Sequence, residues 1–381
     1  MISYGKQHID NEDLKSVLKT LRSDKITQGL QIKRFENSLK KKLKCKNALT
    51  VSSGTAALHL IAKSLEWKKG DLILISSITF VATSNIALNL GATVDFIDVN
   101  YDDGNISIKS LLKKILYYKK KNIKIKSVVV TDYGGLPADW HELYKLKKKY
   151  KFSLISDNCH SFGSKYMGSI NYQTKYTDAA SLSFHPVKHI TTGEGGAILT
   201  NNSNIIKRCE ILRSHGVIRN KSFSPWFYKV EEPGFNYRMS DINAALGVSQ
   251  IKKLNIFIKR RKQIAKIYDN FFSKIDLCKI PKPQKNKTHS YHLYPLLIDF
   301  NKLHISKRTF FNKLKEKGII LQVHYIPIYR HGIFKNKKIN YKELKNSELF
   351  YKNEISLPIF YSLKNTEINK VCKAIKKILD N

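Results

Sequence analysis

Short, almost wholly apolar runs alternate with amphipathic segments through the first half of the chain. The segments between the runs repeat apolar residues at the three- and four-residue spacing of a helix. The runs predict strands at residues 48–51, 71–75, 93–99, 126–131, 153–157, 179–184 and 196–200. Strands that are apolar on both faces are typical of a mostly parallel sheet covered by helices on two sides. We therefore expect an α/β fold for this part of the chain.

Helical patterns continue outside this region. One helix should begin with Asn11 as its N-cap, and a long basic helix should run from Ser240 through Tyr268. Beyond it the pattern predicts strands at 291–298 and 319–323 and helices at 307–317 and 366–379. A segment rich in Phe, Trp and Pro at 221–234 and a polar segment rich in Pro and Lys at 281–289 should be loops. We predict a large domain over residues 1–250 and a small α+β domain over residues 251–381.

The formal net charge of +38 raises the question of nucleic-acid binding. Lys accounts for 58 of the 68 basic residues and Arg for 10, whereas proteins that read phosphates and bases usually rely on the fork-shaped Arg side chain. Many lysines lie on the polar faces of helical patterns, as at residues 143–150. We therefore expect no nucleic-acid partner, although a weak attraction to anionic ligands fits this charge.

The distribution of apolar residues and cysteines indicates where in the cell the protein is expected. No run of about 18 apolar residues is present, so no membrane-spanning helix and no membrane partner are predicted. The first residues lack the apolar core of a signal peptide. The five cysteines are scattered without a CxxC pair, which favours reduced thiols over a disulfide framework or a zinc site. We expect a cytoplasmic protein without a bound metal.

One lysine is distinguished by its position, because Lys188 falls between the predicted strands at 179–184 and 196–200. A Ser/His/Pro turn precedes it and a Gly-rich run at 193–196 follows it, so the side chain is held on a tight connection. A lysine amine that burial keeps partly neutral can form a Schiff base. The alternative is an ordinary solvated lysine, which is the usual state of any one lysine in a protein.

Two further features bear on this choice. A Ser/Gly/Thr turn at residues 52–55 follows a strand and opens a helix, where free N–H groups and the helix dipole can hold a phosphate. Asp157 stands at a strand end, where ligands gather in parallel sheets, and Phe80 and His160 offer flat rings. Each residue alone also fits an ordinary role as a cap, a core residue or a loop residue. Together with Lys188 they predict a site for pyridoxal phosphate.

The segments that carry these residues resemble the DegT/DnrJ/EryC1/StrS family of nucleotide-sugar aminotransferases. The most specific of them are residues 52–58, 157–163, 183–198, 213–216 and 234–239. The resemblance covers nearly the whole chain, from Thr27-Gln28-Gly29 to the segment 354–358. It implies the fold of pyridoxal-phosphate-dependent transferases of type I, like that of aspartate aminotransferase. This fold has a mostly parallel sheet in the large domain and a small C-terminal α+β domain.

The resemblance also assigns roles by position. It implies that Lys188 is the Schiff-base lysine, that Asp157 pairs with the pyridine nitrogen, and that His160 and Phe80 lie against the cofactor ring. The cofactor would alternate between its aldehyde form, PLP, and its amine form, PMP. The residues implied to hold its phosphate are Gly54, Thr55, Ser183 and, from a neighbouring subunit, Asn236. That last role requires a homodimer with composite active sites.

The implied sugar pocket draws on both ends of the chain. Its residues would be Tyr4, Lys25, Thr27, Arg238, Tyr325, Ile326 and Pro327, with a surface ion pair as the alternative role of Arg238. The segments 292–295 and 324–329 favour a UDP-linked 4-keto-6-deoxy sugar of the N-acetylaltrosamine type, aminated at C4 with L-glutamate as donor. The product would serve pseudaminic acid or another surface glycan.

Alternatives within the family remain. Some members are sugar dehydratases in which a histidine replaces the lysine, and the presence of Lys188 favours transamination. A dehydratase that uses PLP or PMP is the alternative reaction. The exact sugar stays open, and with it a perosamine-type aminotransferase, because Asp24-Lys25 and the segment 224–226 depart from the expected pattern. Both departures fall on the side of the molecule where the sugar is expected.

Overall fold

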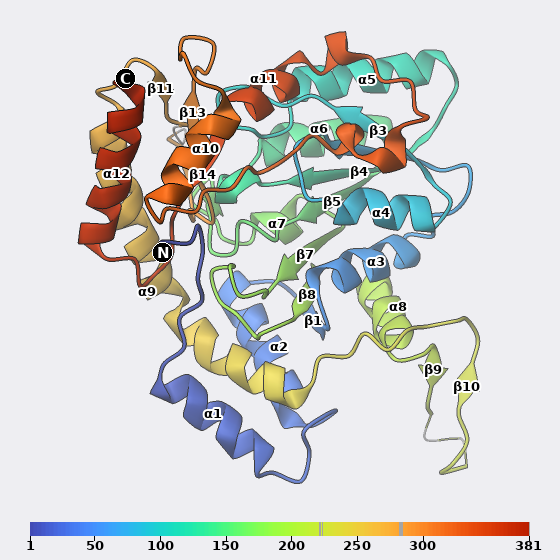
Figure 1. The fold of residues 1–381 in the computed structure, drawn as a ribbon. Coiled ribbons are helices and arrows are strands. Elements are labelled where there is room, and N and C mark those ends of the chain that lie inside the picture. Colours follow the sequence, from blue (N-terminus) through green and yellow to red (C-terminus); the bar gives the residue numbers. More distant parts are fainter. Residues whose placement is uncertain (221, 223, 282–284, 381) are drawn as a thin grey trace.

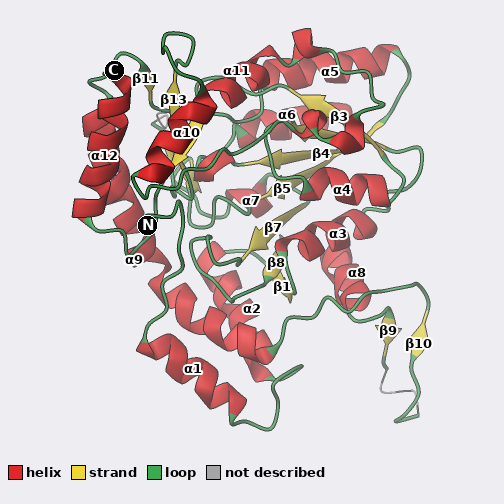
Figure 2. Cartoon of the chain, viewed as in Figure 1, coloured by secondary structure: helices red, strands yellow, loops and turns green. Residues whose placement is uncertain are grey.

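A seven-stranded sheet lies at the centre of the computed structural model, which describes residues 1–220, 222, 224–281 and 285–380. The order along the sheet is β1-β8-β7-β5-β4-β2-β3 (Figure 1 and Figure 2). The strands are β1 (Asn47–Val51), β2 (Leu72–Ser76), β3 (Thr93–Ile97), β4 (Ile125–Thr131), β5 (Ser153–Asp157), β7 (Ala179–Ser183) and β8 (Gly196–Thr200). Of these seven strands only β8 runs against the others. The predicted strands and the α/β fold are therefore confirmed.

The sheet buries apolar side chains on both faces, because successive residues of a strand point to opposite sides. In β2, Ile73 and Ile75 join one apolar cluster, whereas Leu72 and Leu74 join another. The first cluster packs against α3 (Gly54–Ser64), α4 (Ala82–Asn89) and α8 (Ser203–Arg213). The second packs against α5 (Ile108–Lys120), α6 (Trp140–Tyr150) and α7 (Tyr172–Lys175). A third cluster joins α2 (Leu30–Leu43) and α9 (Asp241–Phe272) to β7 and β8.

A separate antiparallel sheet forms toward the C-terminal end (Figure 1). Its order is β11 (Cys278–Lys279), β13 (Tyr294–Ile298) and β14 (Glu354–Leu357). Its core includes α10 (Lys307–Glu316), α12 (Asn365–Leu379), the end of α9 and Ile2 from the other end of the chain. The 32-residue helix α9 thus contributes to both cores. The predicted domain boundary at residue 250 falls inside this helix and stays a prediction.

Short elements complete the chain. They are α1 (Asn11–Leu21), β6 (Lys165–Tyr166), β9 (Val217–Ile218), β10 (Lys229–Val230), β12 (Lys287–Thr288), α11 (Lys345–Asn353) and the 3-10 turns η1 (Tyr133–Gly135), η2 (Ile328–Arg330), η3 (Gly332–Phe334) and η4 (Tyr341–Glu343). The expected loops at 221–234 and 281–289 contain the two-residue strands β10 and β12. Residues 221, 223 and 282–284 of those loops lie outside the described residues.

Two sequence expectations were wrong in detail. The segment 319–323 is not a strand, because it makes only single bridges, from Ile319 to Ile2 and from Gln322 to Ser356. The N-cap of α1 is Asp10 rather than Asn11. The Asp10 carboxylate accepts from the N–H of Asp13, and the Asp13 carboxylate accepts from the N–H of Asp10, so the two form a reciprocal capping box.

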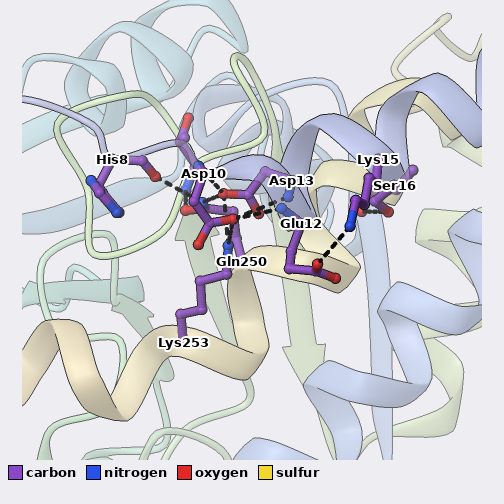
Figure 3. A network of polar contacts seen from close by, with 10 residues as sticks. His8, Asp10, Glu12, Asp13, Lys15, Ser16, Gln250 and Lys253 are labelled. Atoms are coloured by element: carbon purple, nitrogen blue, oxygen red, sulfur yellow. Dashed lines mark hydrogen bonds and ion pairs between the residues drawn. The ribbon is translucent and has the colours of Figure 1, made fainter.

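A polar cluster ties α1 to α9 and to the loop that follows β7 (Figure 3). Gln250 donates to the Oδ2 atom of Asp13 (2.7 Å) and to the main-chain oxygen of His8 (2.9 Å). Its Oε1 atom accepts from the N–H of Thr191 (3.4 Å), and Lys253 pairs with Asp13 (2.8 Å). Because one buried amide side chain of α9 bonds both to α1 and to the loop that follows β7, the three segments are fixed relative to one another.

We expect Asp241, the buried first residue of α9, to be essential for stability because it caps α2. Its carboxylate accepts from the N–H groups of Gly29 (2.6 Å), Gln31 (2.8 Å) and Ile32 (3.4 Å). Asp241→Ala should lower the free energy of unfolding by about 2–3 kcal/mol in a urea titration, because it leaves these donors without their acceptor. The exposed Asp24→Ala should change it by less than about 0.5 kcal/mol. Equal effects in the two variants would contradict the capping role.

Candidate active site

The carboxyl ends of neighbouring strands meet at one edge of the large sheet. Thr131 of β4 pairs with Asp157 of β5, and β7 ends beside them at Ser183. Helix α3 begins on the same edge, at Gly54, soon after β1 ends. Ligands of parallel sheets bind at this edge. The topology therefore brings the predicted strand-end carboxylate and the predicted phosphate cradle to one place.

Lys188 lies on the connection between β7 and β8, as the sequence predicts. Its N–H donates to the main-chain oxygen of His185 (2.9 Å), which closes a tight turn. The N–H of Thr192 donates to the oxygen of Phe184 (3.0 Å) and closes the base of the loop. The Nζ atom of Lys188 lies 3.3 Å from the Nε2 atom of His292. The amine is thus held by the loop and by a partner from a distant part of the chain.

The surroundings favour a neutral amine on Lys188. Burial lowers the pKa of this amine, Cys159 and Asp157 oppose the shift, and the charge of Arg261 adds to it. Arg261 is itself buried and donates to three main-chain oxygens, those of Tyr291 (3.0 Å), His292 (3.2 Å) and Ile359 (2.8 Å). A neutral amine is the nucleophilic form that Schiff-base chemistry requires.

Lys188 opens onto a cavity of about 480 Å³. Nine of the predicted site residues line it, namely Tyr4, Gly54, Thr55, Phe80, Asp157, His160, Ser183, Lys188 and Tyr325. They come from the N-terminal segment, from α3, from the ends of β5 and β7 and the loops that follow them, from the residues before α4, and from the segment before η2. Residues far apart in the sequence therefore share one concave site.

Neutral rings form one wall of this cavity. The hydroxyl of Tyr325 lies 2.8 Å from the Nε2 atom of His160, and the two rings stack with centroids 5.8 Å apart. Burial holds the pKa of His160 well below its usual value. The ring of Phe80, which is 53% exposed, lies 6.1 Å from that of Tyr325. This wall offers flat, uncharged surfaces to a planar ligand.

The remaining walls fit the phosphate and the pyridine nitrogen of PLP. A Cβ atom at Gly54 would lie 2.9 Å from the Cβ atom of Ser183 and 3.2 Å from the Sγ atom of Cys159, so only glycine keeps this helix start open. Asp157 is 4% exposed, and its Oδ1 atom accepts from the N–H of Cys159 (3.3 Å). The Asp157 carboxylate lines the cavity, where it can face a protonated ring nitrogen. The cavity therefore suits the cofactor.

The other six predicted site residues do not line the cavity. Ile326 and Pro327 follow Tyr325 along the chain, with Ile326 exposed and Pro327 buried. Lys25, Thr27 and Asn236 are exposed on the surface. Arg238 lines a second hollow, of about 540 Å³.

The second hollow lies where two segments of the chain meet. These segments hold Lys25, Thr27, Asn236 and Arg238. Gln28 and Arg238 both line the hollow, and Thr27 forms a bridge with Ser240. Asn236 forms a bridge with Ser214, another residue of its lining. Within one subunit, four predicted site residues therefore gather at a surface distinct from the cavity of Lys188.

The family model of the DegT/DnrJ/EryC1/StrS aminotransferases matches residues 7–376. The chain belongs to this family. It is 37% identical over 380 residues, covering 100% of this chain and 98% of the relative, to a UDP-4-amino-4,6-dideoxy-N-acetyl-beta-L-altrosamine transaminase of Campylobacter jejuni. The prediction of the family is confirmed.

Solved structures agree with the fold of this family member. Helicobacter pylori PseC, an aminotransferase involved in the biosynthesis of pseudoaminic acid, has a TM-score of 0.91, 32% identity, and coverage of 100% of this chain and 99% of its own. Streptococcus pneumoniae Spr1654 in its PMP form has a TM-score of 0.90, 26% identity and coverage of 100% and 99%. A PLP form of Spr1654 has also been solved. The type I fold and the cofactor are therefore confirmed, and the protein is a PLP-dependent aminotransferase.

Sequence reasoning missed several residues that the fold brings to the cavity. His292 is the main one, because it contacts the Lys188 amine and its ring lies 4.5 Å from that of His160. His324 and Thr131 line the cavity as well. Sequence reasoning used His292 only as part of a predicted strand and of the segment 292–295 in the family resemblance, and neither signal indicates a partner for a lysine 104 residues away.

We expect Gly54→Ala to weaken cofactor binding, because the added methyl group would press on Ser183 and Cys159 at the phosphate cradle. A titration with PLP, followed by absorbance, should show an affinity at least about tenfold lower, the loss of about 1.4 kcal/mol. Gly332→Ala is the matched control, because a Cβ atom there meets nothing within 4 Å. An unchanged affinity in Gly54→Ala would contradict the cradle.

Proposed function

We propose that this aminotransferase transfers the amino group of L-glutamate to C4 of a UDP-linked 4-keto-6-deoxy sugar of the N-acetylaltrosamine type, for pseudaminic acid or a related surface glycan. The observation that carries the proposal is the Lys188 amine at the wall of a cavity that also holds Asp157 and the cradle at Gly54. The printed activity of the Campylobacter relative, at 37% identity over the whole chain, supports the choice of sugar.

Each side chain of the cavity then has a chemical task. PLP, when bound, supplies an electron sink for the bonds that change at the carbon bearing the amine. Lys188 would hold the cofactor through Nζ, and its amine could also carry a proton between neighbouring atoms. Asp157 keeps the pyridine nitrogen protonated, and the N–H groups at Gly54 and Thr55 hold the phosphate. Ser183 adds a hydroxyl to that cradle, and His160 and Phe80 lie against the ring.

The sugar would enter from the side of Tyr4 and Tyr325. Both line the cavity, and both carry a phenol that burial keeps neutral, because it raises the pKa of each hydroxyl. Neutral hydroxyl groups can donate to or accept from sugar hydroxyls without adding charge. Ile326 and Pro327, which follow Tyr325, would shape the entrance from the same segment.

A second subunit would complete this site. Lys25, Thr27, Asn236 and Arg238 lie away from the cavity of their own chain, on two segments that meet at the second hollow. In a symmetric dimer, such a surface can serve the active site of the other subunit. Asn236 would then reach the partner's phosphate cradle, while Lys25, Thr27 and Arg238 would contact the substrate. The active unit is on this proposal a homodimer.

None of the helices in the described ranges is long and apolar enough to cross a bilayer. The proposed substrate is a charged nucleotide sugar. We place the reaction in the cytoplasm as part of the proposal.

A sugar dehydratase is the second candidate, and Lys188 argues against it. Loss of water from the sugar without net transfer of the amine would identify that reaction. A perosamine-type aminotransferase differs only in the sugar and nucleotide that it accepts. A panel of 4-keto nucleotide sugars, with glutamate consumption as the readout, separates these possibilities.

Lys188→Ala should abolish transamination, because no other amine among the residues that line the cavity can bind the cofactor covalently. Borohydride should fix PLP to the wild-type chain at the peptide that contains Lys188, and mass spectrometry should find no such adduct in the variant. Glutamate consumption with the UDP-sugar should fall at least about 10⁴-fold. Turnover at the wild-type rate would refute both the role of Lys188 and the proposed function.

Mixed dimers should test the composite site. Lys188→Ala and Asn236→Ala homodimers should each be nearly inactive, whereas co-purified mixed dimers hold one site with both native residues. With random pairing, activity should recover to about a quarter of the wild-type value. If both residues of a site came from one subunit, every site in the mixture would carry a lesion and no activity would return.

A further inference from the structure

His324 is a wall residue of the cavity whose ring is anchored from behind. It is 8% exposed, and its ring centroid lies 5.4 Å from that of Tyr4. Its Nδ1 atom lies 2.7 Å from the hydroxyl oxygen of Ser356 on β14. Its Nε2 atom has no hydrogen-bond partner among the described residues, so this nitrogen remains for a ligand. The Nε2 atom of His324 can accept a hydrogen bond when the ring proton is on Nδ1, and it can donate one when the proton is on Nε2.

Glu354 stands directly behind this pair and is fully buried. Its Oε2 atom accepts from the main-chain N–H of His324 (2.9 Å), and its Oε1 atom accepts from the Ser356 hydroxyl (2.5 Å). The Ser356 hydroxyl has one proton. When it donates that proton to Glu354, its oxygen can only accept from His324, so the Nδ1 atom of His324 must carry a hydrogen.

We propose that Glu354 and Ser356 form a relay that sets the tautomer of His324, so that a charged Glu354 makes the Nε2 atom of His324 a hydrogen-bond acceptor for the sugar and a protonated Glu354 makes it a donor. When Glu354 gains a proton, it donates to Ser356, Ser356 donates to Nδ1, and the ring hydrogen moves to Nε2. His324 stays neutral throughout. Glu354 and Ser356 are positioning residues, because they act through His324.

Several groups face Glu354 from the elements packed against it. Lys307 of α10 donates to the main-chain oxygen of Glu354 (2.5 Å) and lies near its carboxyl group. Tyr133 of η1 donates to the main-chain oxygen of His324 and also faces the carboxyl group. Burial raises the pKa of Glu354 to about 7, and the Lys307 ammonium opposes this rise. The relay should therefore change state close to neutral pH.

The same carboxylate also holds the backbone that leads to the ring wall. It bonds to the N–H of His324, and Tyr133 bonds to the carbonyl of the same residue. The next residue is Tyr325, whose hydroxyl contacts His160. A change in Glu354 therefore acts on the cavity through the orientation of this segment as well as through the imidazole ring.

The Glu354→Gln variant removes the carboxylate charge of residue 354 but keeps the size and shape of its side chain. The main-chain N–H of His324 can only donate, so the amide oxygen must face it and the amide nitrogen must face Ser356. Ser356 then accepts from the amide and donates to Nδ1. The variant should therefore hold the Nε2–H tautomer at every pH. Exposed Glu316→Gln, on α10 in the same part of the fold, is the matched control.

The decisive measurement is two-bond 1H–15N correlation NMR on protein labelled at histidine, with the His324 signals assigned by their loss in His324→Asn. In the wild-type protein the Nδ1–H form should dominate above the midpoint, near pH 7, and the Nε2–H form below it. Glu354→Gln should show the Nε2–H form across the range, and Glu316→Gln should match the wild type. A wild-type tautomer that does not change between pH 5.5 and 8.5, about 1.5 units on either side of the midpoint, would overturn the relay.

A kinetic experiment tests whether the relay affects binding of the sugar, and it rests on the proposed function. KM for the UDP-sugar should change by about tenfold across the midpoint in the wild type, the effect of one hydrogen bond, with a smaller change in kcat. In Glu354→Gln the KM should be independent of pH. Failure of the proposed function would appear as no turnover with the tautomer change intact. Failure of the relay would appear as normal turnover with a tautomer that ignores both pH and Glu354.

Discussion

Removal of the Lys188 amine from water is the constraint on which the rest of the site depends. An ammonium without a close counter-charge is costly to bury, so the structure favours the neutral form and lowers its pKa. The nearest polar partner is a neutral imidazole, His292, and not a carboxylate. The same burial keeps His160 and His292 uncharged. Few protons are therefore held near the amine, which suits the Schiff-base role that we propose for Lys188.

This constraint explains the position of Arg261. A buried guanidinium bonded only to main-chain oxygens contributes little obvious stability, and burial lowers its pKa to about 10. Its charge, however, acts on Lys188, His189 and His292 in the same direction, against a second positive charge. Its hydrogen bonds also fix the main chain of His292. One side chain thus supports both the geometry and the charge state of the site.

The sequence was sufficient wherever a local pattern dictated the structure. The apolar run at 153–157 predicted β5 at its observed limits, and parallel topology then placed Asp157 at the ligand-binding edge. The small polar turn predicted the start of α3 for the same reason. The segment 319–323 was wrongly predicted as a strand because its apolar residues serve single bridges and a core contact rather than a ladder.

Sequence patterns could not identify residues whose burial or role depends on tertiary contacts. Arg261 is one of 68 basic residues on a chain where most are solvated, and only the packing of α9 shows that it is buried. A sequence pattern also cannot tell which subunit a residue serves. Thr27 and Arg238, like Asp157, lie in segments that resemble the family, but in one chain they lie at a surface separate from the cavity of Asp157.

The small antiparallel sheet therefore belongs to the chemistry as much as the large one does. β14 supplies Glu354 and Ser356 behind His324, and His292, the partner of Lys188, lies two residues before β13. Neither Arg261 nor Glu354 has a side-chain ion pair within the described part of the chain, so neither charge is neutralised by direct contact. Arg261 lies on the lysine side of the cavity and Glu354 behind the wall formed by His324. Because both charges are buried, water screens them poorly. The charge of Arg261 lowers the pKa of His189 and His292, whereas Glu354 is linked to His324 by the hydrogen bonds of Ser356.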